Sequence, residues 1–307
     1  MVSYPEPWVI PPSSTHTHTI IFLHGRGSNG PRFGSVLSES PATRHGRTLP
    51  QLFPSLKFVF PTASKRRAAV FKRMPIHQWF DHYSLDDPSQ REDLPVDGLR
   101  DTAAYLERLM EEEARGGVAR DRVFLAGLSQ GCAAAIYSLL TLPSAHDDDP
   151  PLAGFIGMSG YLPFARHVLD LLEIGPGSAP DEGEEEDVFE RTDEREDPPR
   201  RVLNFLRENV GTSPLPVVDS CTAKARRPAV LQTPVLLGHG ELDEKVACAL
   251  GRQMADILTG LDMDVQLQIY PSLGHWYQVP EQLEHIAAFL TSRMIKTTSK
   301  ASAVMLS

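Results

Sequence analysis

The sequence predicts an α/β fold, in which one domain is built on a mostly parallel central sheet with helices on both faces. Short apolar runs of strand length alternate with helical patterns along the chain, and several of the runs end in glycine-rich loops. Strands that alternate with helices form parallel sheets that are covered on both sides. With 307 residues, 41% of them apolar, the chain is long enough to bury a sizeable core.

The first half of the chain provides two early strands and one long helix. The apolar run 19–23 ends in a His-Gly-Arg-Gly loop, and a second run, 57–61, stops at a proline. Apolar residues at spacings of three and four predict a helix over 97–113, with Asp97 as its N-cap and a Gly pair at its end. Residues 1–17 are rich in Pro, Ser and Thr and are expected to be irregular.

The alternation of strands and helices continues in the second half. Strands are expected at 123–126, 152–158, 234–238 and 265–270, and helices at 132–140, 246–258 and 282–294. We therefore expect a single domain over 1–307 with its core at about 18–165 and 233–293. Residues 166–232 are interpreted as an insertion that carries one helix near 201–208, and its acidic centre is too poor in apolar residues to order itself. Residues 295–307 are expected to be an irregular tail.

The net charge of −10 comes almost entirely from one segment. Residues 181–197 hold 11 of the 40 acidic residues but only 2 of the 30 basic ones, so the rest of the chain is close to neutral. Without a basic stripe, nucleic-acid binding is not expected. The chain has three scattered cysteines, no secretory signal and no apolar run of membrane length, so we expect a cytoplasmic protein without stable membrane insertion.

The most informative segment is Gly127-Leu128-Ser129-Gln130-Gly131, which joins a predicted strand to a predicted helix. This is the context of a nucleophile elbow, a tight turn in which the serine has a strained backbone and its neighbours two positions away must be small. The alternative interpretation is an N-cap serine on a buried helix. The flanking strand and helix favour the elbow.

A serine hydroxyl needs a base to take its proton and an acid to orient that base. His275 and Asp243 each follow a predicted strand, and active groups gather beyond the carboxyl ends of parallel strands. Taken alone, His275 could be a solvated loop residue and Asp243 a helix N-cap. The chain order Ser129, Asp243, His275 is that of α/β-hydrolases, and it predicts that the three residues form a catalytic triad.

The oxyanion formed during acyl transfer requires two backbone N–H donors. One is expected from Gln130, directly after the nucleophile, and the other from Arg26 in the first glycine-rich loop. Trp79, Phe80 and Trp276 are further candidates for the walls of a substrate pocket, and for Trp79 and Phe80 the alternative is a role in the core.

The other histidines carry less information. His24 is expected to hydrogen-bond the loop backbone rather than to act as a second base. His16 and His18 share one strand face, but a third ligand is not evident, so no metal site and no other cofactor is predicted.

Taken together, these segments resemble the phospholipase/carboxylesterase family, whose best-known members are acyl-protein thioesterases. The matching segments are 23–27, 79–81, 127–131, 239–243 and 274–275, in the order of the family. The resemblance implies an α/β-hydrolase that cleaves acyl esters or thioesters, of acylated proteins or of small molecules, without a cofactor. It also implies the triad and the oxyanion donors named above.

The chain departs from the family pattern at four places, one of which is Trp276, a residue that makes the expected pocket bulkier than usual. Cys132 stands where the family usually has the second glycine of a pair, and Arg26 stands where it usually has a small apolar residue. Residues 163–233 lengthen a connection that is usually short. Three other functions therefore stay open: a tailoring esterase or thioesterase for small natural-product acyl groups, a peptidase with the same triad, and a non-catalytic binding module of hydrolase fold. The sequence does not specify the acyl chain length, the leaving group or the oligomeric state.

Overall fold

The computed structural model describes residues 2–143, 150–172, 197–215 and 227–304, with side chains up to residue 296. A seven-stranded sheet crosses the molecule in the order β1-β3-β2-β6-β7-β8-β9. Its strands are β1 (Trp8–Ile10), β2 (His18–Leu23), β3 (Leu56–Phe60), β6 (Val123–Leu128), β7 (Gly154–Met158), β8 (Val235–Gly240) and β9 (Val265–Tyr270). All neighbours pair in parallel except β1 and β3, so the predicted mostly parallel sheet is confirmed.

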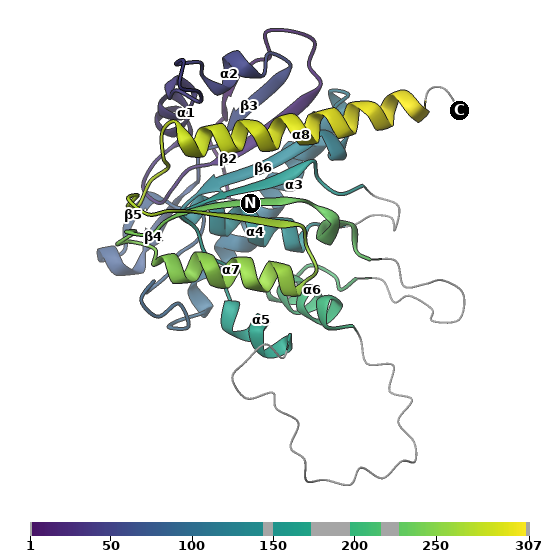
Figure 1. Ribbon diagram of the computed structural model, residues 1–307. Helices are drawn as coiled ribbons and strands as arrows, with labels where there is room; N and C mark the ends of the chain where they lie inside the picture. Colours follow the sequence, from purple (N-terminus) through teal and green to yellow (C-terminus); the bar gives the residue numbers. More distant parts are fainter. Residues whose placement is uncertain (1, 144–149, 173–196, 216–226, 305–307) are drawn as a thin grey trace, which may run out of the picture.

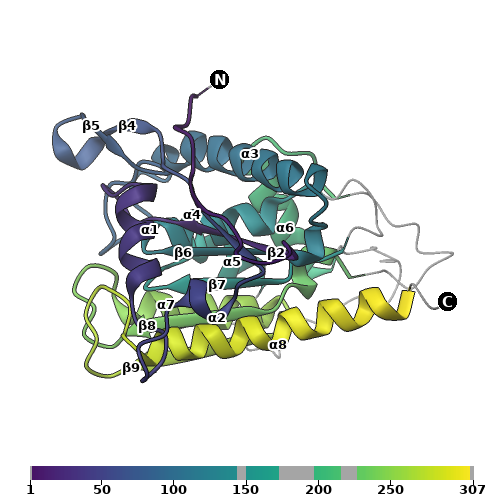
Figure 2. The same cartoon turned by 90° about the horizontal axis from the view of Figure 1, so that it is seen from above.

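Helices cover both faces of this sheet (Figure 1 and Figure 2). One face carries α1 (Gly30–Glu39), α2 (Leu49–Leu52) and α8 (Glu281–Val304), and the other carries α3 (Asp93–Arg115), α4 (Gln130–Thr141), α5 (Ala165–Leu171), α6 (Pro198–Asn209) and α7 (Cys248–Gly260). Alternate residues of β2 show the two layers, since Ile20 and Phe22 pack toward α1 and α8 while Ile21 and Leu23 pack toward α3 and α4.

Smaller elements fill the connections. A two-stranded hairpin of β4 (Lys65–Ala68) and β5 (Met74–His77), which the sequence did not reveal, encloses the short 3₁₀ turn η1 (Ala69–Phe71). Two further 3₁₀ turns, η2 (Arg120–Arg122) and η3 (Ala229–Gln232), precede β6 and β8. The chain after the hairpin, residues 78–82, runs back under the loop that follows β2 and contributes to the site.

Three sequence predictions about the ends of elements are wrong. Residues 8–10 are not irregular but form β1, an antiparallel edge strand, which is where a proline-flanked segment can join a sheet. Helix α3 begins at Asp93, so Asp97 is not its N-cap; Pro95 lies in the first turn, where a missing N–H is tolerated. Helix α8 continues through residues 295–304, because no glycine or proline stops it.

The described parts of the 166–232 segment pack against the core. The Val168 side chain of α5 and the Val202 and Leu206 side chains of α6 are fully buried. The Tyr137 hydroxyl of α4 donates to the Leu206 carbonyl at 2.8 Å, which fixes α6 on α4. The predicted helix near 201–208 is therefore part of α6, and the acidic centre lies outside the described residues.

Candidate active site

Ser129 lies on a sharp turn between β6 and α4, with φ 57° and ψ −124°. A left-handed φ is strained for a residue with a side chain, and such strain is common at functional sites. A Cβ at Gly127 would lie 2.4 Å from the Gly131 carbonyl carbon, and one at Gly131 would lie 2.3 Å from the Leu23 oxygen. The side chain of Ser129 makes no capping hydrogen bond to α4. The strained elbow with small residues on either side is confirmed, and the helix-cap interpretation is not.

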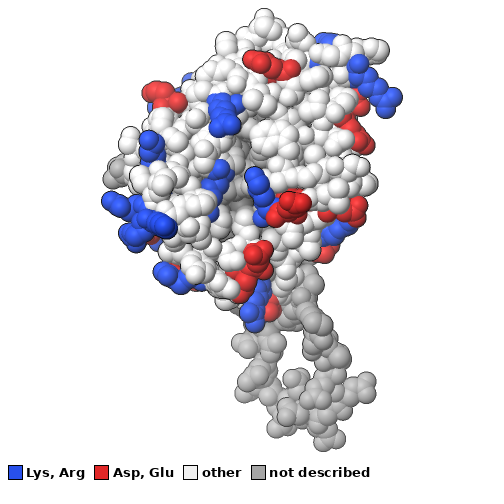
Figure 3. Space-filling model, turned by 90° about the vertical axis from the view of Figure 1, so that its left-hand side faces the viewer, with Lys and Arg blue, Asp and Glu red and all other residues white. Residues whose placement is uncertain are grey.

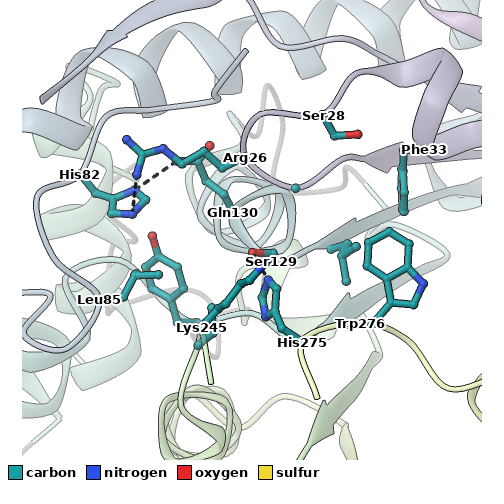
Figure 4. A pocket seen from close by; sticks show the side chains of 14 residues that line it. Arg26, Ser28, Phe33, His82, Leu85, Ser129, Gln130, Lys245, His275 and Trp276 are labelled. Carbon is teal, nitrogen blue, oxygen red and sulfur yellow. Dashed lines mark hydrogen bonds between the residues drawn. The ribbon is translucent and has the colours of Figure 1, made fainter. Parts of the chain in front are cut away.

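The structure brings the three predicted triad residues together from three strand ends. The Ser129 hydroxyl lies 2.9 Å from His275 Nε2, and His275 Nδ1 lies 2.9 and 2.8 Å from the two carboxylate oxygens of Asp243. These are hydrogen-bonding distances, and they join an alcohol, an imidazole and a carboxylate in one hydrogen-bonded series. Figure 4 shows Ser129 and His275 side by side in the centre of a cavity.

The surroundings of Asp243 keep its carboxylate ionised. Burial raises its pKa, but the backbone N–H groups of Val246 and Lys245, each 2.9 Å from Oδ1, and the hydrogen bond to His275 bring the net pKa below the ordinary value. The buried His239 donates from Nε2 to the Val246 carbonyl and lies 3.3 Å from Asp243 Oδ2. An ionised Asp243 requires the proton of His275 on Nδ1, which leaves Nε2 free to accept from Ser129.

The loop after β2 lies directly against the elbow. A Cβ at Gly25 would be 3.5 Å from the Ser129 Cβ, and Gly27 has a φ of 79°, which suits glycine. Among the described residues, no backbone or side-chain acceptor takes the N–H of Arg26 or that of Gln130. Gln130 is the first residue of α4, where backbone N–H groups lack partners inside the helix.

Ser129 and His275 line a cavity of about 270 Å³. Figure 3 shows the face beyond the carboxyl ends of the strands, where a hollow near the centre has Lys and Arg side chains beside it. Phe33, Leu85 and Trp276 contribute apolar wall, whereas Arg26, His82 and Lys245 contribute polar wall. Trp276, which was predicted to form a wall of a substrate pocket, lines this cavity.

Trp79 and Phe80, in contrast, do not line this cavity. Their side chains are 0% and 1% exposed and belong to the core between α3 and the sheet. The Trp79 indole N–H donates to the His24 carbonyl at 2.8 Å, so the ring supports the loop after β2 from below. The pocket role predicted for these two residues is wrong, and the core alternative is correct.

Two neighbours of the elbow have structural roles. His24 Nδ1 donates to the Gly25 carbonyl at 2.7 Å and Nε2 accepts from the Ala63 N–H at 3.0 Å, and burial lowers the pKa of His24 to about 4. The expectation that His24 holds the loop backbone is confirmed. Cys132 is fully buried against Gly157 and Gly160, and burial raises the pKa of its thiol to about 12.

Sequence reasoning missed several residues of the cavity, above all His82 and Lys245. His82 directly follows the segment Trp79-Phe80-Asp81, and Lys245 comes two residues after Asp243, so their positions in the chain were the available signals. Within the described part of the chain, no group of three or more His, Cys, Asp or Glu is arranged to bind a metal. Nor does any helix there combine the length and apolar character needed to cross a bilayer.

A model of the phospholipase/carboxylesterase family matches residues 5–171, which is more than half of the chain. The chain belongs to the phospholipase/carboxylesterase family. A second model, of the prolyl oligopeptidase family, matches residues 212–297, the part that contains Asp243 and His275.

Relatives of this phospholipase/carboxylesterase family protein match over nearly its whole length. Acyl-protein thioesterase 1 of Gibberella zeae is 28% identical over 292 residues, which cover 94% of this chain and 95% of that protein. Acyl-protein thioesterase 1 of Neurospora crassa is 25% identical over 297 residues, which cover 96% of this chain and 94% of that protein. The crystal structure of Zea mays acyl-protein thioesterase 2 has 25% identity and a TM-score of 0.63, covering 95% of this chain and 100% of that one. The predicted α/β-hydrolase fold is confirmed, and the protein is a serine hydrolase of acyl esters or thioesters.

Proposed function

We propose that Ser129, Asp243 and His275 are the catalytic triad of this hydrolase, and that the backbone N–H groups of Arg26 and Gln130 form its oxyanion hole. The observation that carries the proposal is the continuous series of hydrogen bonds from the Ser129 hydroxyl through His275 to Asp243. The ring lies between a strained nucleophile and a carboxylate that backbone N–H groups keep ionised.

In the first step, Ser129 Oγ attacks the acyl carbonyl carbon while His275 Nε2 takes the hydroxyl proton. Asp243 holds the ring through Nδ1–H and stabilises the imidazolium that forms. The carbonyl oxygen becomes an oxyanion, which accepts hydrogen bonds from the two backbone N–H groups. The imidazolium then protonates the departing alcohol or thiol, which leaves an acyl-enzyme. Water, deprotonated by His275, attacks this ester, and collapse of the second tetrahedral intermediate releases the acid and restores Ser129.

For the substrate, the relatives named as acyl-protein thioesterases support S-acylated proteins, with small-molecule esters and thioesters as further substrates. The single continuous sheet and the packing of α6 on α4 support one domain across the chain. A cytoplasmic location stays a prediction.

Replacing Ser129 by alanine tests the proposal. We expect turnover of p-nitrophenyl butyrate to fall by roughly 10⁴-fold or more, because the nucleophile is gone while the fold remains. A fluorophosphonate probe should label the wild type and a Ser35→Ala control, whose serine is half-buried on α1 and does not line the cavity, but not Ser129→Ala. Undiminished turnover or labelling of folded Ser129→Ala would refute the assignment.

Assays of the wild-type protein distinguish between the remaining candidate functions. A palmitoyl-peptide thioester and a short-chain thioester, assayed side by side, distinguish an acyl-protein thioesterase from a tailoring enzyme for small acyl groups. A folded wild-type protein without labelling or turnover would refute the proposed triad.

A further inference from the structure

His82 joins the two residues whose backbone forms the proposed oxyanion hole. Its ring lies in the loop after β5 and lines the cavity. Nε2 is 3.1 Å from Nη1 of Arg26, and Nδ1 is 3.2 Å from the side-chain amide nitrogen of Gln130 (Figure 4). Arg26 belongs to the loop after β2 and Gln130 to the start of α4, so this one ring lies within hydrogen-bonding distance of two separate elements.

The segment around His82 holds both residues by their side chains. Arg26 Nε donates to the Gln78 side chain at 2.8 Å, and its Nη2 lies 3.4 Å from Asp81. Gln130 accepts from the Trp79 N–H at 3.0 Å and donates to the Phe80 carbonyl at 2.8 Å. Residues 78–82 therefore set the distance between the loop after β2 and the start of α4.

The chemistry of His82 makes its two contacts unequal. A neutral imidazole has one acceptor nitrogen and one N–H. Both of its partners are donors, because a guanidinium has only N–H groups and the Gln130 oxygen already accepts from Trp79. Burial and the charge of Arg26 lower the pKa of His82 to about 3, so the ring is neutral at ordinary pH. In each tautomer, His82 accepts a hydrogen bond from one of the two residues only.

These side-chain contacts hold the loop that carries the Arg26 N–H, together with one main-chain bond to the hairpin, from the Gly27 N–H to the His77 carbonyl at 2.8 Å. Arg26 lies between Gly25 and Gly27, and a backbone with glycine on both sides has the greatest conformational freedom. An oxyanion donor must lie about 2.7–3.1 Å from the position of the oxyanion to be effective. A displacement of about 1 Å can cost as much as a hundredfold in rate.

We propose that His82 is a positioning residue for the oxyanion hole, which fixes the spacing of the Arg26 and Gln130 N–H groups through the hydrogen bond that its ring accepts. This inference rests on the proposed function, since it assigns a role within the same site. It predicts an effect on the transition state, where the oxyanion exists, and little effect on binding of the ground-state substrate.

Three substitutions test the role of the ring nitrogens. His82→Phe keeps a ring but removes both nitrogens, His82→Asn retains an acceptor near the place of Nδ1, and His82→Gln retains one near the place of Nε2. We expect His82→Phe to lower kcat about tenfold with KM changed less than twofold, and to weaken inhibition by an alkyl boronic acid, whose tetrahedral adduct resembles the transition state, in proportion to kcat/KM. At least one of the two amide variants should regain most of the lost rate, and it would identify which of the two residues His82 binds.

If His82 acted through packing alone, His82→Phe would have a higher kcat than the two amide variants, because phenylalanine retains the ring volume and the amides do not. Wild-type kcat in His82→Phe, or amide variants no faster than His82→Phe, would overturn the inference. The inference would also be overturned if a rise in KM accounted for the whole loss of kcat/KM while the affinity for the boronic acid stayed the same. His45→Phe, at an exposed position, is the control substitution, and the thermal midpoints of all variants show whether they fold. Loss of labelling in the wild type would instead refute the proposed function, so the two failures are distinguishable.

Discussion

The two halves of the active site are held by different parts of the chain. In the triad half, main-chain bonds join the loops after β8 and β9: the Glu241 N–H donates to the Tyr270 carbonyl and the Leu242 N–H to the Leu273 carbonyl, each at 3.0 Å. In the oxyanion half, bonds to the side chains of Arg26 and Gln130 join residues 78–82 to the loop after β2 and the start of α4: Arg26 binds the Gln78 side chain, and Gln130 binds main-chain groups of Trp79 and Phe80. The proposed reacting groups are side chains in the first half and main-chain N–H groups in the second. Main-chain bonds between loops therefore support the side-chain groups of the first half, whereas the second half also relies on the side chains of the two donor residues themselves.

The largest expected effect comes from the triad half. Asp243→Asn replaces an acceptor that serves two backbone N–H groups and the His275 ring by an amide that must turn a donor toward one of them. The His275 tautomer that receives the serine proton is then disfavoured, and we expect kcat to fall roughly 10⁴-fold. Steady-state kinetics on p-nitrophenyl butyrate measure this, with Asp264→Asn at an exposed ion pair as control. A loss smaller than tenfold would contradict the role assigned to Asp243.

A smaller effect is expected from the oxyanion half. Gln130→Ala keeps the backbone N–H but removes the bonds to the Trp79 N–H and the Phe80 carbonyl. We expect kcat/KM to fall about tenfold to a hundredfold, because the donor is present but less well held. The two buried backbone groups left without partners should also lower the free energy of unfolding by about 1–3 kcal/mol. Kinetics and urea unfolding against an exposed Gln90→Ala control check both expectations, and unchanged kcat/KM would show that the side chains do not position this half.

The smallest expected effect is on stability as a function of pH. Because burial lowers the pKa of His24 to about 4, the unfolded chain takes up a proton first as the pH falls below about 6.5. This histidine alone should lower the free energy of unfolding by about 2 kcal/mol between pH 7.5 and pH 5, and its effect levels off below pH 4. Urea unfolding at the two pH values measures the difference. His24→Gln, which does not titrate, should show a smaller decrease, and an equal decrease would exclude His24 as its source.

The same contrast explains what could be predicted from the sequence. The grouping of Ser129, Asp243 and His275 could be predicted because the sequence itself gives the side-chain types and their order along the chain. The roles of Gln78, Asp81 and His82 depend on a fold-back of the chain after the β4–β5 hairpin, which no local pattern encodes. Trp79 was misplaced for the same reason, since an aromatic residue near the site can face the cavity or lie beneath it.

Element types were also predicted better than element ends. The strand 265–270 matches β9 at both ends, because its alternating apolar and polar residues are bounded by turn residues. Helix α3 begins four residues earlier than Asp97, since the first turn of a helix tolerates proline and needs no side-chain cap. The packing of α6 on α4 could not be read from a segment that is rich in charged residues and interrupted by prolines.

The buried thiol of Cys132 offers a way to observe opening of the elbow. Its sulfur is enclosed between α4 and the end of β7, and a thiol whose pKa is raised to about 12 reacts slowly with disulfide reagents. In a variant with Cys221→Ser and Cys248→Ser, its reaction with such a reagent in native buffer would report how readily this helix transiently separates from the sheet. When the reagent reacts faster than the helix recloses, a thiol-trapping time course would give the lifetime of the closed nucleophile turn without a substrate.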